Sequence, residues 1–317
     1  MSRKPLITIG ITCFNSEKTI IRALKSAFNQ TWENKEIILV DDFSNDDSIN
    51  LIKRFTRDFS NFKLIQHNKN YGYPYAINSI LKNSLGEYIA IFDSDDKSKK
   101  ERLKKQYERY SKYANENKTS NIICYSNRKV INSQKTNTSE IAYAIGRKKL
   151  EPKGEVVAEY ILGIKIPIRK ICYGVFGSCS MFLKKSTFKK IGYFDTSFRR
   201  FAEHDFSIRA SFINCHFIAV NDTLITQYKI EKDYKSQKNI WKYSNLLINK
   251  YKNYLLSKGS YYSSKFLTYT RNFYVKKQKI RAYLCYIIAL FLMPYDQKLL
   301  RIKKSKIINN LFNIKIN

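Results

Sequence analysis

Four short apolar runs in the first hundred residues alternate with amphipathic segments, and this alternation constrains the fold more than any other feature. The runs are rich in Ile, Leu, Val and Phe and occupy residues 6–12, 35–42, 62–67 and 87–93. The segments between them, 16–30, 45–55 and 73–84, are typical of helices. Strands that alternate with helices predict a mostly parallel sheet flanked by helices. Uninterrupted apolar runs indicate strands buried on both faces.

Polar residues follow three of these runs, at the points where the predicted strands end. They are residues 12–15 after the first run, Asp41 and Asp42 at the end of the second, and residues 93–96 after the fourth. Ligands of parallel α/β sheets collect at the carboxyl ends of the strands. We therefore expect these three sets to share one edge of the sheet and to form a binding site there.

The acids after the fourth run suggest a metal site. Asp93 and Asp95 alternate beside a buried strand, so both side chains reach one site if the chain turns there. Two close carboxylates repel each other without a cation, and Mg²⁺ or Mn²⁺ on a diphosphate suits such oxygen ligands. The alternative is that acids at strand ends cap the following helix. This interpretation fits Asp96, with the lysines after it as the solvated start of a helix.

Several blocks of the sequence resemble family-2 glycosyltransferases with the GT-A fold, in the order and spacing of that family. The blocks are TIGITCFNSEKTIIRALKSAFNQTWENKEIILVDDFSNDDS, NKNYGYPYAINSILKNSLGEYIAIFDSDD, GSCSMFLKKSTFKKIGYFD and EHDFSIR. The resemblance covers roughly residues 5–225. It implies a Rossmann-like α/β domain of the GT-A type, with a mostly parallel central sheet.

This resemblance implies that a nucleotide-sugar donor binds at the strand ends. Phe14 stands where a base-stacking tyrosine is common, Asp42 stands where the uracil edge is contacted, and Asp93 lies toward the ribose. The implied metal ligands for Mn²⁺ or Mg²⁺ are Asp93 and Asp95. The residues implied in binding the donor are Thr12, Phe14, Asn15, Asp42, Asn78 and Asp93.

One position departs from the family pattern. Ile77 replaces the arginine that usually precedes the position of Asn78. We therefore expect one phosphate or nucleotide contact to come from another residue, such as a nearby lysine. The identity of the donor stays open at this point.

The family resemblance also points to a catalytic base. The family's base is an acid six residues before an arginine, and Glu203 lies six residues before Arg209. Asp205 is the alternative if the register at the helix start is shifted. Without the resemblance, both acids would be interpreted as stabilising a helix N-terminus and pairing with nearby arginines.

These features predict a metal-dependent glycosyltransferase of the hexosyl-transferring kind. One carboxylate can accept the proton of an attacking hydroxyl, and a single base opposite the leaving group gives inversion, which the family also implies. The expected donor is a UDP-sugar, and the expected acceptor is a hydroxyl of a lipid-linked glycan in capsule, O-antigen or other surface polysaccharide synthesis.

Other functions remain possible on the sequence alone. A sugar nucleotidyltransferase would also have an α/β sheet and metal-binding acids, but its glycine-rich phosphate loop is missing from residues 12–19. A donor-binding domain without activity and a basic protein that binds nucleic acid without catalysis are further alternatives. No recognisable nucleic-acid module is present, so we expect no nucleic-acid partner.

The positive charge is concentrated near the C-terminus. The chain has a net charge of +32, and residues 235–317 alone carry +17, with Asp296 as their one acid. Apolar side chains recur at helical spacing there, and the longest apolar run, Ala282 to Met293, is shorter than the roughly 20 residues of a membrane-spanning helix. We expect helices that bind an anionic membrane surface. The alternative is a helical extension packed on the catalytic domain.

The domain organisation follows from these patterns. Residues 1–98 form the expected nucleotide-sugar half of the GT-A domain, 99–234 the acceptor half, and 235–317 the basic helical extension. Within the acceptor half, residues 133–170 are polar or basic without a regular pattern, so we expect an irregular loop or lid there. The six cysteines are scattered without a CxxC pair, which is typical of a reducing compartment. We therefore expect a cytoplasmic protein, peripheral on the inner face of the plasma membrane.

Overall fold

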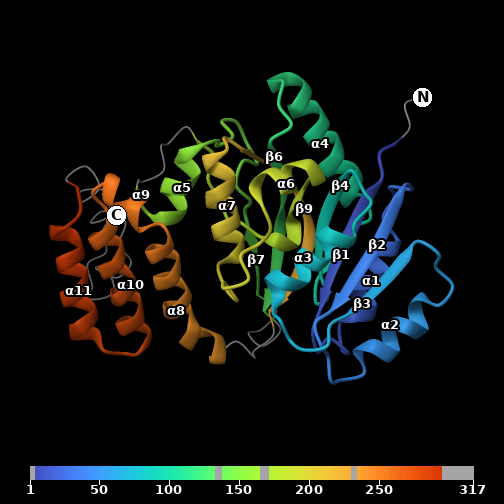
Figure 1. The fold of residues 1–317 in the computed structure, drawn as a ribbon, viewed down its shortest axis with the longest axis horizontal. Helices are drawn as coiled ribbons and strands as arrows, with labels where there is room; N and C mark the ends of the chain where they lie inside the picture. Colours follow the sequence, from blue (N-terminus) through green and yellow to red (C-terminus); the bar gives the residue numbers. More distant parts are fainter. Residues whose placement is uncertain (1–3, 133–137, 165–170, 230–233, 295–317) are drawn as a thin grey trace. The chain divides into compact units, whose positions relative to one another are not determined.

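The computed structural model of the 317-residue chain describes residues 4–132, 138–164, 171–229 and 234–294 (Figure 1). The chain forms two compact units. The first comprises Met1–Glu155 and Arg169–Glu231, and the second comprises Val156–Ile168 and Lys232–Asn317. The functional division at residues 98 and 234 stays a prediction.

A mixed nine-stranded sheet forms the centre of the first unit. Its order is β3-β2-β1-β4-β8-β6-β9-β5, and β7 pairs with β6. The first four strands in this order are parallel, as are β6 and β9, whereas β8 and β5 pair with their neighbours antiparallel. The strands are β1 (Ile7–Cys13), β2 (Lys35–Asp41), β3 (Phe62–Gln66), β4 (Tyr88–Asp93), β5 (Lys97–Ser98), β6 (Ile122–Asn132), β7 (Ser139–Ala142), β8 (Phe182–Lys184) and β9 (His216–Lys229).

Helices cover both faces of the parallel part of this sheet. On one face, α1 (Ile20–Phe28), α2 (Ser48–Thr56) and α4 (Arg102–Asn117) share a core with alternate residues of β1, β2 and β4. On the other face, α3 (Tyr73–Asn83) packs on β2. All seven residues of β1 are buried, which confirms the predicted burial on both faces and the α/β class.

The approach of α3 to the sheet depends on one glycine. A Cβ atom at Gly10 of β1 would lie 2.5 Å from Cγ2 of Ile80 on α3, closer than two carbon atoms can pack. A glycine at this position therefore lets α3 lie directly on β1. Because α3 begins at the edge where the strands end, this contact fixes the height of its first turn relative to the predicted site.

Two predictions about the middle of the chain were wrong. The residues after Asp96 do not start a helix, because Lys97 and Ser98 form β5 and pair antiparallel with β9. The helix α4 begins only at Arg102. The stretch 133–170, expected to be irregular, contains β7 and the helix α5 (Glu155–Leu162) among its described residues. Pairing with distant strands decided the first case, and local sequence does not reveal such pairing.

The second unit is helical, as predicted for the C-terminal part of the chain. Its C-terminal helices are α8 (Tyr234–Lys250), α9 (Lys252–Ser257), α10 (Tyr261–Val275) and α11 (Lys279–Phe291). The helix α10 packs against both α8 and α11, and Lys258 forms an ion pair with Glu159 of α5 at 3.4 Å. Among the described residues, none of the helices combines the length and apolar character needed to cross a bilayer.

Candidate functional site

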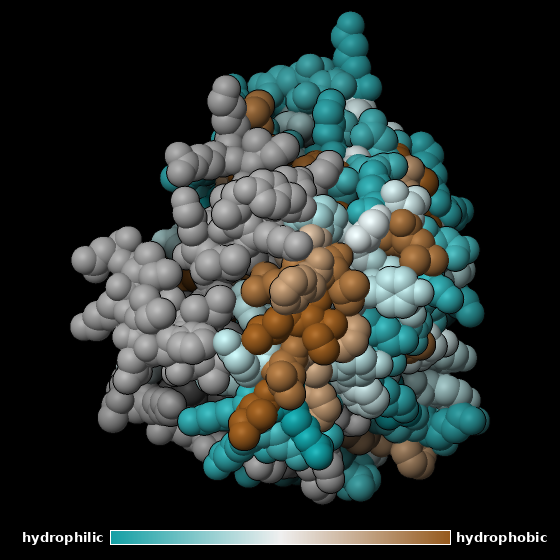
Figure 2. Space-filling model, turned by 90° about the vertical axis from the view of Figure 1, so that its left-hand side faces the viewer, coloured by the Kyte–Doolittle hydropathy of each residue, from teal (hydrophilic) through white to brown (hydrophobic). Residues whose placement is uncertain are grey.

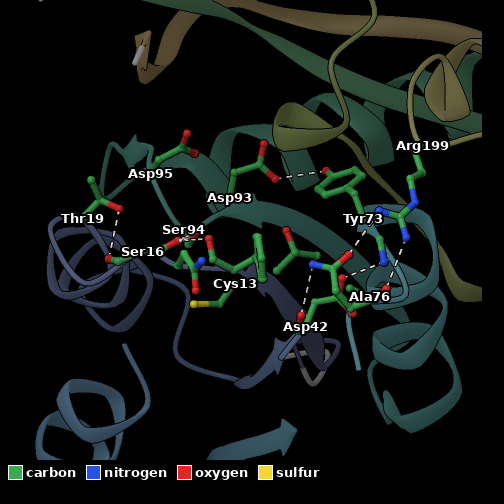
Figure 3. Close-up of a pocket in the computed structure, with 15 residues that line it drawn as sticks. Cys13, Ser16, Thr19, Asp42, Tyr73, Ala76, Asp93, Ser94, Asp95 and Arg199 are labelled. Carbon is green, nitrogen blue, oxygen red and sulfur yellow. Dashed lines mark hydrogen bonds between the residues drawn. The ribbon is translucent and has the colours of Figure 1, made fainter. Parts of the chain in front are cut away.

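A cavity of about 520 Å³ lies at the edge of the sheet where β1, β2 and β4 end (Figure 3). This volume is within the range of ligand-binding pockets, roughly 300–1,000 Å³. The strand register explains why the predicted residues meet here, because Thr12 of β1 lies beside Asp93 of β4 and Cys13 lies beside Asp41 of β2. The residues that line the cavity are Thr12, Cys13, Phe14, Asn15, Ser16, Thr19, Asp42, Asn70, Gly72, Tyr73, Ala76, Asp93, Ser94, Asp95 and Arg199.

All but one of the residues predicted to bind the donor line this cavity. The exception is Asn78, which is buried on α3. Its side-chain amide donates to the Phe194 carbonyl at 2.8 Å, and its amide oxygen accepts from the Phe194 N–H at 2.9 Å. Both polar groups of Asn78 are therefore engaged in holding the chain before α7 (Ala202–Phe212) against α3.

Asp42 is held in place by three donors. Its carboxylate accepts hydrogen bonds from the N–H groups of Tyr71 at 3.0 Å and Gly72 at 2.7 Å, and lies 2.7 Å from Nδ1 of His67. Gly72 has φ +94°, which is the left-handed region that glycine adopts without strain. Asp42 is therefore fixed at the cavity wall as an oriented acceptor.

Sequence reasoning missed the role of His67. Its imidazole bridges Asp42 and Ser79 of α3, whose hydroxyl lies 2.9 Å from Nε2. His67 follows β3, which pairs in parallel with β2 and its terminal Asp41. A polar residue at the end of the third predicted strand was the available signal, because the strand ends share one edge.

The loop after β1 brings an aromatic ring to the cavity. Phe14 is 48 % exposed, and the next residue, Asn15, has φ 48°. Asn15 joins the loops after β1 and β2, because its N–H donates to Ser44 Oγ and its amide oxygen accepts from the Asn45 N–H, both at 2.9 Å. Positive φ is uncommon outside glycine and concentrates at functional sites. The loop therefore presents the ring of Phe14 on a fixed backbone.

Asp93 and Asp95 form an acidic pair at the far end of the cavity. The hydroxyl of Tyr73 donates to Asp93 Oδ1 at 3.0 Å and lies 2.8 Å from Ser178 Oγ. Burial and then the charge of Asp95 raise the pKa of Asp93 to about 7. Burial also raises the pKa of Asp95. Figure 3 shows the two side chains next to each other at the cavity.

This pair fits a divalent cation. Arg22 donates to the backbone carbonyl of Asp95 at 2.5 Å, and no cationic side chain of the described chain forms an ion pair with the Asp93 or Asp95 carboxylate. Two carboxylates whose charged forms are disfavoured by burial and mutual repulsion gain most from a hard cation with oxygen ligands. The donor set is the one that Mg²⁺ or Mn²⁺ prefers.

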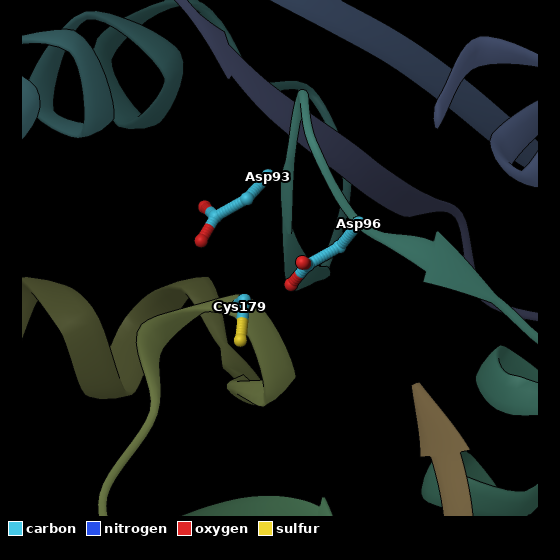
Figure 4. Close-up of side chains that lie close together, drawn as sticks. All are labelled: Asp93, Asp96 and Cys179. Atoms are coloured by element: carbon cyan, nitrogen blue, oxygen red, sulfur yellow. The ribbon is translucent and has the colours of Figure 1, made fainter. Parts of the chain in front are cut away.

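Asp96 does not cap a helix, so that prediction was wrong. Its carboxylate is buried with Asp93 and the thiol of Cys179, and the ligand atoms of the three residues lie within 4.8 Å of one another (Figure 4). Within the described part of the chain, no N–H or O–H group donates a hydrogen bond to either oxygen of Asp96. Burial and the charges of Asp93 and Asp95 raise the pKa of Asp96. The residue at the N-cap position of α4 is Glu101.

Glu203 and Asp205 lie in the first turn of α7 but have different surroundings. Burial acts to raise the pKa of Glu203, but the neighbouring His204 and the charge of Arg128 outweigh it and hold this pKa below its usual value. Nδ1 of His204 lies 3.5 Å from Glu203 Oε1. Glu203 is thus an ionised carboxylate at neutral pH, able to accept a proton.

Asp205 is fully buried and paired. It accepts a hydrogen bond from Nε of Arg209 at 3.0 Å. The same guanidinium donates to the carbonyls of Ile191 at 2.8 Å and Tyr193 at 2.9 Å. Asp205 therefore orients an arginine that ties α7 to the chain before it.

Tyr73 connects the two acidic groups. Burial raises its pKa, and the charges of Asp93 and, more weakly, of Glu203 raise it further. Glu203 does not line the cavity, but its charge acts on the same hydroxyl that donates to Asp93. The predicted metal-binding pair and the predicted base therefore both act electrostatically on one half-buried tyrosine.

Comparison with known proteins shows which family the sequence is similar to. The model of the glycosyl transferase family 2 matches residues 8–185, more than half of the chain. The chain is 41 % identical over 91 residues to UDP-Glc:alpha-D-GlcNAc-diphosphoundecaprenol beta-1,3-glucosyltransferase WfaP of Escherichia coli, which covers 29 % of this chain and 36 % of WfaP. It is 39 % identical over 104 residues to poly(ribitol-phosphate) beta-glucosyltransferase of Bacillus spizizenii, or 32 % of this chain and 16 % of that protein.

The fold has close counterparts among solved structures. The crystal structure of S. aureus TarS 1–349 in complex with UDP-GlcNAc matches with a TM-score of 0.62 at 18 % identity, over 94 % of this chain and 84 % of that one. The sequence matches to curated relatives such as WfaP each span less than half the length of the relative. The family match covers the strand ends that form the cavity, Asp93 and Asp95 included. The chain belongs to the glycosyl transferase family 2.

Proposed function

We propose that this chain is an inverting glycosyltransferase that moves a sugar from a UDP-sugar to a hydroxyl of a glycan. The observation that carries the proposal is the cavity at the strand ends, where an oriented acceptor, Asp42, and an acidic pair, Asp93 and Asp95, face the same space. Glu203, whose charge also acts on the Tyr73 hydroxyl, is an ionised acid suited to accept a proton. This combination supports a nucleotide diphosphate site next to a base.

The residues divide the chemistry between them. A divalent cation bound by Asp93 and Asp95 would neutralise charge on the leaving diphosphate. Phe14 and Asp42 would hold the nucleobase, with the ring of Phe14 exposed for stacking. Glu203 would take the proton of the acceptor hydroxyl as its oxygen bonds to the anomeric carbon. As this bond forms, the bond from the anomeric carbon to the diphosphate oxygen breaks, and its electron pair leaves on that oxygen. Because the hydroxyl attacks opposite the leaving group, the configuration of the anomeric carbon is inverted.

We place this reaction in the synthesis of a surface polysaccharide on a lipid-linked acceptor. The name of WfaP describes transfer to a diphosphoundecaprenol-linked sugar, and the name of the Bacillus spizizenii relative describes transfer to poly(ribitol-phosphate). Both acceptors are anionic polymers or lipids. A basic C-terminal part that approaches an anionic membrane would suit such a substrate.

The helix α11 supports a membrane-bound position. Its packed face contains Ala282, Tyr286 and Ala289. A second face leaves apolar side chains open to solvent, which Figure 2 shows as a hydrophobic area on the side that it presents. The exposed residues are Ile280, Leu284, Ile288, Phe291 and Leu292. Exposed cationic side chains lie just before this apolar face or between its residues in the sequence. They are Lys276, Lys277, Lys279 and Arg281. We propose that this face rests on the inner, anionic leaflet of the plasma membrane, with the protein in the cytoplasm.

Release of UDP in the presence of Mn²⁺ tests the function. UDP-sugars would first be screened by thermal shift, and turnover of the stabilising sugar nucleotide would then be compared for wild type and Glu203→Gln. We expect Glu203→Gln to keep nucleotide binding and to lose about 10²- to 10⁴-fold in rate, the usual contribution of a general base. The control is Glu33→Gln, which changes an exposed acid just before β2, at the opposite end of that strand from the cavity.

Two results would contradict the proposal. Stabilisation by no nucleotide sugar, with or without Mn²⁺, would rule out the donor. Full activity of Glu203→Gln, together with loss of activity in a folded Asp205→Asn variant, would move the base to Asp205. We expect Asp205→Asn instead to lower the unfolding temperature, because it weakens the ion pair with Arg209.

A further inference from the structure

We infer that Arg199 and Asp42 together read the nucleobase of the donor and select a base with a ring N–H beside a carbonyl. The inference rests on the proposed function and adds the residue that replaces a missing family contact. Three carboxylates line the cavity, those of Asp42, Asp93 and Asp95, and Arg199 is the one cationic side chain among the described lining residues. The family's arginine on α3 is replaced by Ile77, which is fully buried.

The position of Arg199 is set by the segment that also holds Asp42. Its guanidinium donates to Asn70, with Nη1 3.4 Å from the side-chain oxygen and Nη2 3.3 Å from the backbone carbonyl. Its side chain lies over Gly72, since a Cβ there would be 3.6 Å from Cγ and Nε of Arg199. Gly72 in turn donates to the Asp42 carboxylate. Arg199 is thus anchored to the wall that carries Asp42.

This location separates Arg199 from the metal-binding pair. In Figure 3, Tyr73 lies between Asp93 and the Arg199 guanidinium, and Asp95 lies farther away on the other side of Asp93. The diphosphate belongs at the Asp93 and Asp95 end, where a cation would bind it. A ligand that spans the cavity therefore presents its base, rather than its phosphates, to Asp42 and Arg199.

The two side chains have complementary hydrogen-bonding roles. A carboxylate only accepts, and a guanidinium has five N–H donors, of which the contacts to Asn70 engage two. An acceptor beside a donor matches a ring N–H beside a carbonyl. Uracil, with N3–H and O4, and guanine, with N1–H and O6, carry this pattern. Cytosine and adenine have no ring N–H at the corresponding edge, so they mismatch Asp42.

Titration calorimetry with four nucleotides tests this inference. Wild type and Arg199→Ala would each be titrated with UDP, GDP, CDP and ADP in Mn²⁺. We expect wild type to prefer UDP or GDP. We expect Arg199→Ala to bind that nucleotide about tenfold or more weakly than wild type does. This is the usual loss for a hydrogen bond to a charged group. The affinity of Arg199→Ala for CDP should change less than about twofold. The preference of this variant for UDP or GDP over CDP should therefore fall.

Two further variants sharpen the result. Arg199→Lys keeps the charge but not the fork of donors, so it should restore less than half of the lost preference. Lys69→Ala removes an exposed charge one residue from Asn70, outside the residues that line the cavity, and should bind all four nucleotides as wild type does. Because Arg199 is exposed, Arg199→Ala should unfold at the wild-type temperature.

The outcomes distinguish this inference from the function on which it rests. An equal loss for all four nucleotides would place Arg199 on the diphosphate and overturn the assignment to the base. No loss for any nucleotide, or a wild-type preference for CDP or ADP, would overturn it as well. If wild type binds none of the four, the donor proposal itself fails. If wild type binds UDP and Arg199→Ala binds it equally well, only the inference about Arg199 fails.

Discussion

The three acids that follow β4 occupy neighbouring positions but have different surroundings. Asp95 lies at the cavity, Asp93 lies at its wall under the Tyr73 hydroxyl, and Asp96 is buried behind it with Cys179. Burial and mutual repulsion raise the pKa of both Asp93 and Asp96. Without a cation, such a pair keeps a proton near neutral pH. The charge at this strand end therefore depends on what is bound there, and not only on the number of carboxylates.

At the same scale, His216 gives a prediction about pH and stability. His216 is buried at the start of β9, and its Nδ1 lies 3.1 Å from the Tyr113 hydroxyl. Burial and then the charge of Lys153 lower its pKa, against a smaller opposing effect of Glu151. The unfolded chain therefore binds the proton more readily than the folded one. The contribution of neutral His216 to stability is present above the unfolded pKa, about 6.5, and is lost as the pH falls below it.

Urea unfolding at pH 7.5 and 5.5 measures this effect. We expect the free energy of unfolding of wild type to fall between these pH values by more than that of His216→Gln, which keeps a polar side chain but does not titrate. The difference between the two proteins isolates His216 from the carboxylates that titrate in both. An identical fall in wild type and His216→Gln would show that this imidazole does not contribute.

At the scale of elements, the parallel first half of the sheet was predictable, whereas the antiparallel pairing within the second half was not. The strands β1 to β4 are long, apolar and separated by helices, so each is visible in a local window of sequence. The end of each strand fixes the position of its polar residues, which is why Thr12, Asp42 and Asp93 were correctly placed at one edge. For these strands, the local sequence pattern and the topology of the sheet predict the same positions for the polar residues.

The remaining features depend on contacts between distant segments. The short strand β8 lies between β4 and β6, although its three residues are too few to show a period. Residues 199 and 70 meet at the cavity across 129 positions of sequence, so the Arg199 contact has no local signal. Asn78 shows the converse, because its family position predicted donor binding whereas its amide engages the Phe194 backbone.

The junction of α4 with the sheet gives a prediction about stability. Arg102 is fully buried and donates to the Ile91 carbonyl at 2.8 Å, Ser98 Oγ at 3.0 Å and Gln106 Oε1 at 3.0 Å. Burial lowers its pKa to about 10, so it remains charged at neutral pH and offsets the buried acids Asp93 and Asp96. Arg102→Met would leave these acceptors without a donor. We expect a loss of about 3 kcal/mol or more in the free energy of unfolding.

Chemical denaturation at neutral pH checks this prediction, with Lys104→Met as the matched control. Lys104 is on the same helix but exposed, so its substitution should change the free energy of unfolding by less than about 0.5 kcal/mol. If Arg102→Met is as stable as Lys104→Met, the buried guanidinium does not hold the junction.

At the scale of the whole molecule, charge and exposed apolar surface coincide in the C-terminal part. Residues 235–317 carry a net charge of +17, more than half of the total. The exposed residues of α11 recur at positions 280, 284, 288 and 291, which is one face of a helix. A cationic helix with one apolar face is typical of segments that lie in a membrane interface. Solvation alone would not account for this apolar face.

Flotation with lipid vesicles tests whether α11 binds a membrane. The variant combines Ile280→Asp and Phe291→Asp, two side chains that are 78 % and 79 % exposed, so the fold should tolerate both. Each large apolar side chain contributes about 1.5–3 kcal/mol when it is buried. We therefore expect the variant to lose at least about tenfold in binding to vesicles that contain phosphatidylglycerol. Wild type should bind these vesicles more tightly than vesicles of phosphatidylcholine alone, and high salt should reduce the difference.

The control places the same substitution on the other unit. Leu85→Asp combined with Leu150→Asp changes two side chains that are 78 % and 55 % exposed and lie in the first unit, so this control adds the same two negative charges without touching α11. If this variant floats as wild type does and the α11 variant does not, the exposed apolar face of α11 is the membrane contact. Equal loss in both variants would indicate that net charge alone decides binding. Unchanged flotation of the α11 variant would remove this helix as an anchor, and a lipid-linked acceptor would then have to be reached by diffusion from solution.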